Sequence, residues 1–551
     1  MPVLSFKGKT AVEHYHHAVP HHVLEVDREL SVLPQGESPS LDGNLIIEGD
    51  NLLALKALLP THAGKVKCVY IDPPYNTGNE GWIYNDNLTQ PQFKDWIGKV
   101  VGKEGEDACR HDKWCCMMYP RLRLVRELMA ADGVVFVSID DNEMHNLRAL
   151  MDEVFGEESR LGTIAWKTRN TDNRVKTNLS CDHEYVLAYS RTRGSVRGRV
   201  IDRSSFQNPD NDPRGPYVTD PLTGKATQKE RPNLHFTIKN AATGDEYEPD
   251  PARGWITDRA GIADLLAENL IAWPPDPKTG KPRKKRFLSA TSERMPISTF
   301  WADLKGQSGA AEVDEILGKR MFAFPKSREF MERIVDLGAG PEDIVLDPTA
   351  GSGTTAHAVL SINKQDGGSR RFILIQQKHD SAEHRAADIN ICEDIAAERL
   401  RRVMHGYEVA TGRKQGERRE GISGKFTYAR VDRPLLGDYR TWGERLPPFE
   451  EIARYVFFTE TGLELDLDGI DESSGRIGEH GGTSFYLLYS AREDSSRAFD
   501  QKVLDLLAAD KNPHKVVYCE KVWVHREDLV RLRRDIGHVR TMLIPFQVRT
   551  S

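Results

Sequence analysis

Two short apolar segments, each followed by an Asp-Pro step, constrain the fold of this chain more than any other feature. Residues 66–71 (VKCVYI) run into Asp72-Pro73-Pro74-Tyr75, and residues 343–346 (DIVL) run into Asp347-Pro348 and a glycine-rich turn. A segment that is apolar at nearly every position is typical of a strand buried on both faces of a parallel sheet. Open parallel sheets bind ligands at the carboxyl ends of their strands, so we expect both aspartates to lie at a site.

Helical patterns separate such strands along the chain. Leucines repeat at helical spacing over residues 52–59. Similar patterns predict helices over residues 114–129, 144–154 and 382–403, and strands at residues 134–139, 163–166, 184–189 and 372–375. Strands that alternate with helices indicate an α/β fold with a mainly parallel sheet.

The alternation stops between residues 191 and 320, where proline, glycine and charged residues cluster and only residues 260–269 form a convincing helix. This stretch is typical of an inserted, irregular domain. We therefore expect five parts: an N-terminal surface arm (1–43), a first core segment (44–190), an inserted domain (191–320), a second core segment (321–405) and a small C-terminal α/β domain (420–551).

Composition excludes several classes of protein. A chain of 551 residues with 39% hydrophobic and 29% charged residues is too long for a single small binding module and too mixed for a disordered or membrane chain. We see no secretory signal and expect a cytoplasmic protein. The seven cysteines form no C-x-x-C pair, so we expect reduced thiols and no metal site. The net charge, 76 − 83 = −7, argues only weakly against a nucleic-acid partner, because one cleft can still concentrate positive charge.

Asp72-Pro73-Pro74-Tyr75 has the groups needed to activate an exocyclic amine of a nucleobase. Such an amine is a weak nucleophile because its lone pair is conjugated into the ring. The Asp72 carboxylate and the Pro73 carbonyl can hold its two hydrogens, and the two prolines fix that carbonyl in place. Tyr75 offers an aromatic face for a base that has left the duplex. The alternative is a proline-stiffened strand exit with a buried aspartate and a core tyrosine.

Residues 347–355 (DPTAGSGTT) form the second candidate site. The glycines let the backbone approach a ligand, and the following helix start favours a carboxylate or phosphate. The spacing also fits a dinucleotide-binding turn, so the motif alone leaves a nicotinamide oxidoreductase open. Asp347 suits a ligand with an ammonium group, such as the amino-acid end of S-adenosylmethionine. After the next strand, Gln376 or Gln377 could bond ribose hydroxyls.

The order of these motifs resembles the β group of DNA amino-methyltransferases. The segments NLIIEGDNLLALKALLP (44–60), VYIDPPYNTG (69–78), VFVSIDDNE (135–143) and DPTAGSGTTAHAVL (347–360) are most similar to the modification (Mod) subunit of type III restriction-modification systems. The resemblance covers residues 41–405. It implies a circularly permuted, Rossmann-like core of seven strands that uses S-adenosylmethionine, with an inserted target-recognition domain and a small C-terminal α/β domain.

The resemblance also implies roles for individual residues. Asp72, Pro73, Pro74 and Tyr75 match the catalytic tetrapeptide. Asp50 matches an acid that accepts from the cofactor's adenine amine, with a helix cap as its alternative, and Phe324 lies in a segment (324–327) that lines the methionine end. The full set of expected cofactor contacts is Asp50, Asn51, Asp72, Phe324, Asp347, Thr349, Gly351, Ser352, Gly353, Thr354 and Gln377.

Methylation of a base in a duplex requires flipping that base and gripping the phosphates around it. A charge run is often only a solvated surface, but basic residues concentrate between the two motifs. The DNA-contact candidates are Lys167, Arg169, Arg174, Lys176, Arg191, Arg193, Lys281, Arg283, Lys284 and Lys285.

The sequence thus predicts a site-specific methyltransferase that modifies the N6 amine of adenine in double-stranded DNA. The alternatives are a cytosine-N4 methyltransferase, because the same tetrapeptide serves either amine, and a non-catalytic DNA-recognition subunit. The resemblance implies a homodimer and a separate restriction (helicase-nuclease) subunit as partner.

Overall fold

A computed structural model describes residues 4–77, 110–172, 175, 179–192, 194–304, 306, 308–318, 321–412, 414–436, 446–492, 497–531 and 536–544. It contains a ten-stranded sheet in the order β1-β19-β2-β16-β15-β3-β4-β6-β5-β14. The strands are β1 (His22–Val32), β2 (Leu45–Glu48), β3 (Val66–Ile71), β4 (Met129–Ile139), β5 (Arg160–Lys167), β6 (His183–Ser190), β14 (Phe300–Trp301), β15 (Ile344–Asp347), β16 (Arg371–Gln376) and β19 (Phe426–Pro434). The mainly parallel α/β fold predicted from the sequence is confirmed.

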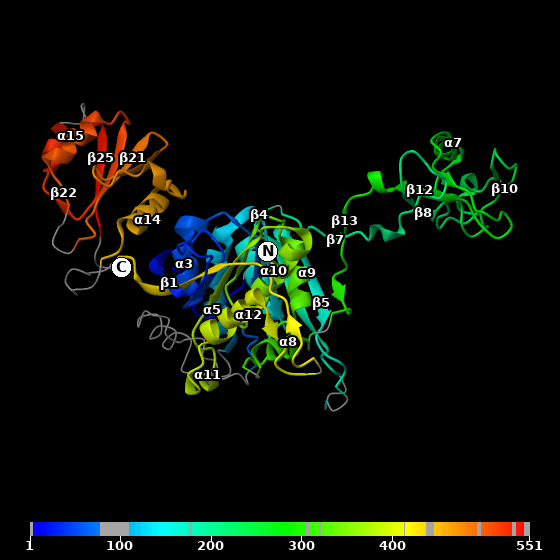
Figure 1. Cartoon of the computed structure of the whole chain (residues 1–551). Helices are drawn as coiled ribbons and strands as arrows, with labels where there is room; N and C mark the ends of the chain where they lie inside the picture. Colours follow the sequence, from blue (N-terminus) through cyan, green and yellow to red (C-terminus); the bar gives the residue numbers. More distant parts are fainter. Residues whose placement is uncertain are drawn as a thin grey trace. The chain divides into compact units, whose positions relative to one another are not determined.

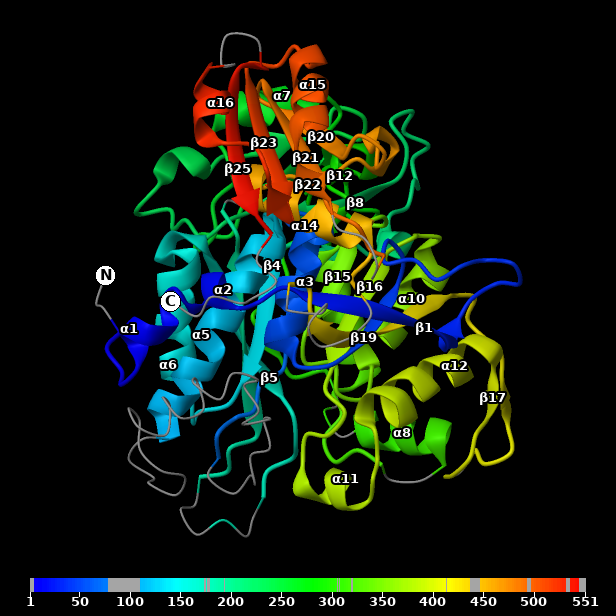
Figure 2. The same cartoon turned by 90° about the vertical axis from the view of Figure 1, so that its left-hand side faces the viewer.

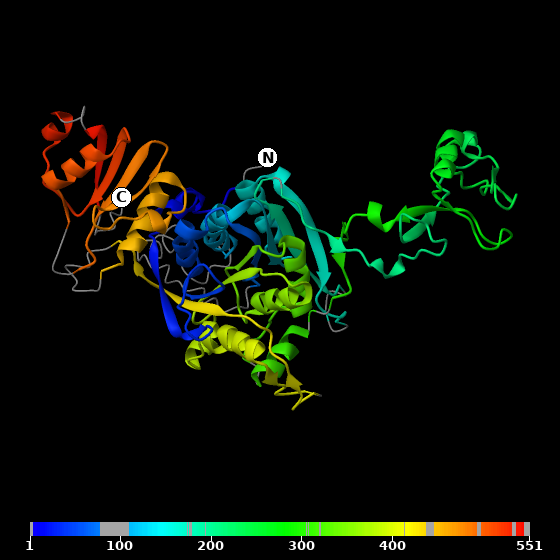
Figure 3. The same cartoon turned by 45° about the horizontal axis from the view of Figure 1, so that its top comes forward.

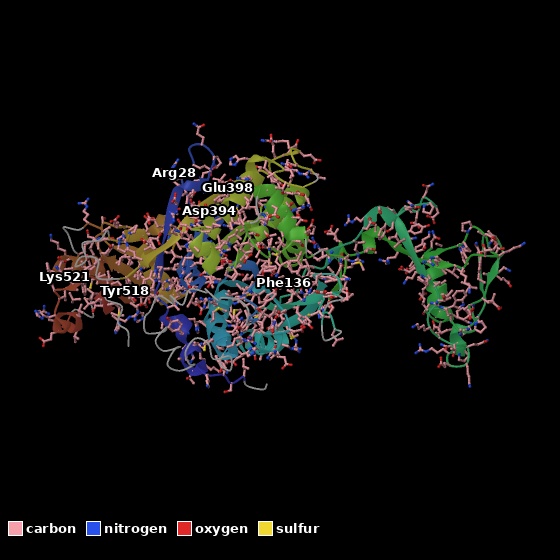
Figure 4. The ribbon with its side chains drawn as sticks, turned by 90° about the horizontal axis from the view of Figure 1, so that it is seen from below. Arg28, Phe136, Asp394, Glu398, Tyr518 and Lys521 are labelled. Carbon is pink, nitrogen blue, oxygen red and sulfur yellow. The ribbon has the colours of Figure 1, made fainter. Side chains whose placement is uncertain are left out.

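The centre of the sheet is parallel and buried. β15 pairs in parallel with β3 and β16, while β6 is antiparallel to β4 and β5. Consecutive residues of β4 face opposite sides of the sheet. Phe136, which Figure 4 labels on this strand, is fully buried. Because β3, β15 and β16 run in the same direction, Asp72, Asp347 and Gln376 emerge at the same edge.

Helices cover both faces of this sheet (Figure 1). α3 and α5 pack against each other with α6 in one hydrophobic cluster on the first face, and α9 packs on β3, β4 and α10 on the second. The helices are α3 (Asn51–His62), α5 (Arg110–Leu128), α6 (Met144–Phe155), α8 (Ser308–Leu317), α9 (Arg328–Gly338), α10 (Thr354–Asp366), α11 (Ala382–Ala386) and α12 (Glu398–His405). The single helix expected over residues 382–403 is instead α11, a loop, a π-helical segment (Ile391–Ala397) and α12.

The N-terminal segment differs from the irregular arm that we expected. It forms α1 (Lys9–Val12), α2 (Tyr15–Ala18) and β1, and both Val12 and Val19 are buried. β1 pairs antiparallel with β19, and the two lie side by side as blue and yellow strands in Figure 3. β19 in turn pairs in parallel with β2. With β14 at the opposite edge, these strands extend the sheet beyond the seven expected.

Residues 198–297 form a separate compact unit, which lies inside the predicted insertion 191–320 but is shorter at both ends. Its small core includes Trp255, Tyr247 and Ile262. Its elements are β7 (Arg199–Val200), β8 (Tyr217–Pro221), β9 (Ile238–Lys239), β10 (Glu246–Tyr247), α7 (Arg259–Ala267), β11 (Ile271–Ala272), β12 (Arg283–Phe287) and β13 (Arg294–Met295). β12 pairs with β8 and β11, and β7 with β13.

The C-terminal part has its own sheet, β20-β21-β23-β25, whose strands lie side by side in Figure 2. Alternate residues of β21 enter different clusters, with Phe485 and Leu487 on one face and Tyr486 and Leu488 on the other. The elements are α14 (Phe449–Thr461), β20 (Arg476–His480), β21 (Thr483–Leu488), β22 (Ala498–Phe499), α15 (Gln501–Ala509), β23 (His514–Cys519), β24 (Lys521–Val522), α16 (Arg526–Arg531) and β25 (His538–Leu543), and a small pair, β17 (Tyr407–Glu408) and β18 (Arg418–Arg419), precedes β19.

In the part of the chain that the structure describes, none of the helices has the length and apolar character needed to cross a bilayer.

Candidate active site

A pocket of about 1330 Å³ opens at the carboxyl ends of β3, β15 and β16. Both sequence motifs line it: residues 72–75 from the end of β3, and residues 347–352 with Thr354 and Thr355 from the end of β15. A direct hydrogen bond joins the motifs, because the Asp72 backbone N–H donates to Thr349 Oγ1 at 2.8 Å. The volume exceeds that of a pocket for one drug-sized ligand, so two ligands can share it.

The corner at residues 72–75 is held from outside the pocket. The indole N–H of Trp114 on α5 donates to the Pro74 carbonyl at 2.7 Å. Asn76 then adopts a positive φ of 59° and donates from its side chain to Glu143, which is fully buried. These contacts fix the exit of β3 and leave the Asp72 and Tyr75 side chains at the pocket wall.

Asp72 and Tyr75 share a charged cluster with two residues from distant segments. Lys326 Nζ lies 3.0 Å from Asp72 Oδ1 and 2.8 Å from Tyr75 Oη. Glu184 of β6 accepts from Tyr75 Oη at 2.8 Å, and its Oε2 lies 3.4 Å from Lys326 Nζ. We name Asp72, Tyr75, Glu184 and Lys326 the amine cluster.

Burial and charge act against each other within the amine cluster. Burial raises the pKa of Asp72 and the Glu184 charge adds to the rise, whereas the Lys326 ammonium opposes it. Burial works against the Lys326 charge, yet the two carboxylates outweigh it and raise the pKa of Lys326. The ammonium is therefore the counter-charge that favours ionised Asp72.

The glycine loop after β15 depends on two left-handed residues. Gly351 has φ +52° and Gly353 has φ +75°, a region that side chains with a Cβ rarely adopt. A Cβ on Gly351 would lie 2.9 Å from the Phe322 ring. Gly353 begins α10 without a side-chain cap, so the helix start offers backbone N–H groups to a ligand.

Asp347 is buried at the start of this loop. It accepts hydrogen bonds from Thr355 Oγ1 and from the Thr349 backbone N–H, the latter at 3.0 Å. Burial, offset only in part by these bonds, raises the pKa of Asp347 to about 7. A buried carboxyl with such a pKa gains most from a ligand cation placed beside it.

The strand ends beside the loop supply further polar groups. Gln376 Oε1 accepts from the Gly351 N–H at 2.8 Å, so its amide supports the loop, while Gln377 also lines the pocket. Asn51 lines the pocket and donates to the Pro348 carbonyl at 3.0 Å. The Asp50 carboxylate caps α3 by accepting from the N–H of Leu52, the role that we named as its alternative.

Phe324 lines the same pocket and is 84% exposed, which suits a side chain that covers a bound ligand. Pro325 and Lys326 follow it into the site. A ligand that packs against this exposed ring would bury apolar surface, and that burial would favour binding.

Only part of the expected DNA-contact set is available at a surface. Lys167 is half-buried, Arg169 is exposed at the pocket rim, and Arg191 donates to the Met129 carbonyl. Arg174, Lys176 and Arg193 lie outside the described residues.

In the separate unit, Lys281 and Arg283 are exposed and Lys284 is half-buried. Lys285 is different, because its ammonium is buried and lies 2.5 Å from Asp210 and 3.1 Å from Asp212. Two carboxylates already neutralise it, so its surroundings do not support the DNA contact that we expected.

Sequence reasoning missed several groups that shape the pocket. Glu184 belongs to the amine cluster although more than a hundred residues separate it from Tyr75. Arg399 on α12 is fully buried, donates to Thr354 Oγ1 at 2.8 Å and to Ser352 Oγ at 3.2 Å, and pairs with Glu312. Arg399 lies four residues before the buried Val403, so it is a charged residue on the apolar face of a helix. That pattern in the sequence could have identified Arg399.

We expected no metal site. Among the described residues, His16, His17 and Glu127 bring one ligand atom each within 4.8 Å of one another. Burial, helped by the nearby His17, Arg123 and Lys56 side chains, lowers the pKa of His16 to about 4. The positive charges of Arg123 and Lys56 weaken the attraction of the group for a metal ion.

Comparison with known proteins places this site in a family context. The family described as DNA methylase matches residues 66–387. The StyLTI Mod subunit of a type III restriction-modification enzyme from Salmonella typhimurium is 33% identical over 380 residues, which cover 65% of this chain and 57% of that protein. The EcoPI Mod subunit of Escherichia phage P1 is 32% identical, with 62% and 59% covered.

A type II methyltransferase, M.KpnI from Klebsiella pneumoniae, is 31% identical over 354 residues, covering 60% of this chain and 80% of that protein. The match to the two Mod subunits thus spans less than two thirds of their length.

Proposed function

The chain belongs to the DNA methylase family, and from that premise we propose that it transfers a methyl group from S-adenosylmethionine to the N6 amine of adenine in double-stranded DNA. The observation that carries this proposal is the single pocket lined by both motifs, with Asp72 bonded through its backbone to Thr349. An amine-holding carboxylate and a loop suited to an ammonium-bearing ligand therefore face one space.

The residues around the glycine loop fit S-adenosylmethionine. Asp347 offers a buried carboxylate to an ammonium group, the uncapped start of α10 offers N–H groups to a carboxylate, and Phe324 offers an apolar cover. The other expected cofactor contacts that line the pocket also belong to the proposed binding set: Asn51, Asp72, Thr349, Gly351, Ser352, Thr354 and Gln377. Asp50 and Gly353 were expected too but are not among the residues that line the pocket. When bound, the cofactor supplies a methyl group on a positively charged sulfur.

Residues 72–75 are proposed to bind and orient the target base. In the proposed reaction the Asp72 carboxylate and the Pro73 carbonyl accept the two hydrogens of the target amine, which turns its lone pair toward the methyl donor. Tyr75 stacks on the flipped base. The amine loses its proton only after it has been attacked, so positioning of the amine matters more than a strong base.

We expect Asp72→Ala to abolish methyl transfer, because no acceptor then orients the amine, with a loss on the order of a thousandfold. Tritiated S-adenosylmethionine and unmethylated plasmid DNA measure the transfer, and calorimetric titration of the cofactor with thermal melting controls for folding. Full activity in a folded Asp72→Ala protein would contradict the proposed mechanism.

Two alternatives are separated by direct measurements. Cytosine N4 carries the same kind of amine, so hydrolysis of the methylated DNA and identification of the modified base decides between the two targets. A protein that binds cofactor and DNA but transfers no methyl group would instead be a DNA-recognition subunit.

The similarity to Mod subunits also supports proposals about partners. We propose that the chain acts in the cytoplasm as a homodimer on DNA and joins a separate restriction subunit. The compact unit of residues 198–297 is the proposed target-recognition domain, with Lys281, Arg283 and Lys284 as its basic contacts, and Lys167 and Arg169 are the proposed contacts near the pocket. Arg191 bonds to Met129 at the amino end of β4, on the opposite edge of the sheet, so it is left out of this set.

A further inference from the structure

An ammonium group already binds where the proposed reaction needs an amine. Lys326 Nζ lies 3.0 Å from Asp72 Oδ1, the carboxylate proposed to hold the target. The same nitrogen donates to Tyr75 Oη at 2.8 Å and sits 5.0 Å from the centre of the Tyr75 ring. Lys326 therefore contacts both side chains that are proposed to receive the flipped base.

Glu184 contacts both Tyr75 and Lys326 and so completes this cluster. Its Oε2 accepts from Tyr75 Oη at 2.8 Å and lies 3.4 Å from Lys326 Nζ. Tyr75 Oη also lies 3.1 Å from Asp72 Oδ1, so every member of the amine cluster contacts at least two others. Such a ring holds the Tyr75 side chain in one orientation at the pocket wall.

The charges in the amine cluster leave one negative charge uncompensated. Asp72 and Glu184 carry two negative charges and Lys326 one positive charge. Among the residues that the structure describes, the other titratable groups that face Asp72 are Tyr70 on β3 and Asp347 on β15, and Asp140 faces Glu184. Lys326 is thus the cation that these acids share.

A purely structural role does not account for this arrangement. Buried ion clusters contribute little net stability, because desolvation offsets the attraction between the charges. Both Glu184 and Lys326 line the pocket rather than the core.

On the basis of the function proposed above, we propose that Glu184 and Lys326 are positioning residues for the target amine. Together they hold the Tyr75 ring and keep a carboxylate ready at Asp72. When the base enters, Lys326 yields its place on Asp72 to the target amine and stays bound to Glu184, so no charge has to leave the pocket.

The first test compares Lys326→Met, which keeps the apolar stem, with Glu184→Gln, which keeps the shape. We expect each to lower kcat at neutral pH on the order of tenfold, because the ring and the carboxylate lose their alignment. The dissociation constant for S-adenosylmethionine, measured by calorimetry, stays at the wild-type value. Lys425→Met, on an exposed lysine paired with Glu37, is the matched control.

The pH profile of kcat distinguishes positioning from general destabilisation. Removing the Lys326 cation leaves the Asp72 carboxylate uncompensated, so the acidic limb of the profile moves to higher pH. Removing the Glu184 charge takes away a repulsive neighbour, so the limb moves to lower pH. Lys326→Arg retains a cation at this position, so we expect the acidic limb of its kcat profile to lie at the same pH as in wild type. Shifts in one common direction, or no shift in either variant, would overturn the proposal.

A second measurement needs neither cofactor nor DNA. In Lys326→Met, two half-buried carboxylates, Asp72 and Glu184, lose their shared cation, and their mutual repulsion lowers stability only when both are ionised. The melting temperature of this variant therefore falls furthest below wild type at pH 8 and recovers as the pH is lowered, whereas Glu184→Gln is stabilised at pH 8. A pH-independent deficit in Lys326→Met would contradict the charge assignment. If wild type transfers no methyl group, the proposed function fails, and this melting test still decides whether the cluster works as described.

Discussion

At the scale of one residue, the protonation state of Asp347 determines how strongly the pocket can bind a ligand that carries an ammonium group. Because burial raises its pKa to about 7, its carboxyl is partly protonated at neutral pH. A group whose folded pKa is raised in this way favours the folded state at low pH, and this contribution is lost as the pH rises through 7. A bound ammonium group reverses that loss by pairing with the carboxylate.

We therefore expect S-adenosylmethionine to bind more tightly as the pH rises from 6 to 8, because the proton must leave Asp347 before the ammonium can pair with it. Calorimetric titration across this range measures the dependence. Asp347→Asn, which cannot ionise, should bind weakly and with a flat profile. A flat profile in wild type would show that Asp347 does not meet the ammonium.

Single residues also show where prediction from sequence succeeds. Asp72 and Asp347 follow segments that are apolar at nearly every position, so their place at one sheet edge could be predicted from the sequence alone. Glu184 could not be found in this way, because its strand β6 is antiparallel to β4 and its contact with Tyr75 depends on three-dimensional pairing. Lys326 entered the prediction only as part of the segment 324–327, since one lysine after a proline has no pattern of its own.

At the scale of elements, the turn between β15 and α10 sets how closely a ligand can approach. Gly351 is left-handed and packs against Phe322, so any side chain there meets the ring as well as backbone strain. Gly367, at the other end of α10, is also left-handed but has no atom within 4 Å of its missing Cβ. A substitution at Gly351 therefore causes both backbone strain and a steric clash, whereas a substitution at Gly367 causes backbone strain alone.

We expect Gly351→Ala to weaken S-adenosylmethionine binding about tenfold, because its Cβ displaces the Phe322 ring toward the pocket. Gly367→Ala should cost a similar backbone strain, about 1 kcal/mol, and leave binding unchanged. Cofactor titration and chemical denaturation of both variants measure the two effects. Equal losses of affinity would mean that strain alone matters.

Elements were predicted well where their pattern is strong. The buried strands and the amphipathic helices come from clear periodicity, and β3 has the predicted bounds. β1 was missed because it is an edge strand with polar residues on both faces. The π-helical segment was missed because its sequence reads as ordinary helix; Asn390, which caps it, gave no distinguishable signal.

At the scale of the whole molecule, the compact unit of residues 198–297 begins and ends at a single pair of short strands, β7 and β13. β7 and β13 pair antiparallel, with Arg199 opposite Met295, so both ends of the unit lie beside each other. Such an insertion can be removed without stretching the chain that remains.

We predict that replacing residues 201–293 by a short Gly-Ser turn leaves cofactor binding intact and abolishes methylation of specific DNA sites, because the unit is the proposed recognition domain. Cofactor titration and sequencing of modified bases give the two readouts. Unchanged site preference in the deletion variant would assign recognition to another part of the chain.

The position of β2 has a consequence for how the protein is made. Its two neighbours, β16 and β19, come from residues 371–376 and 426–434, far downstream in the chain. During synthesis, β2 therefore has no partner strand until residues 371–376 have emerged, and its second edge stays unpaired until residues 426–434 follow. Late synthesis, rather than early folding, completes this sheet, and a chain truncated before that point would expose a strand ready to aggregate.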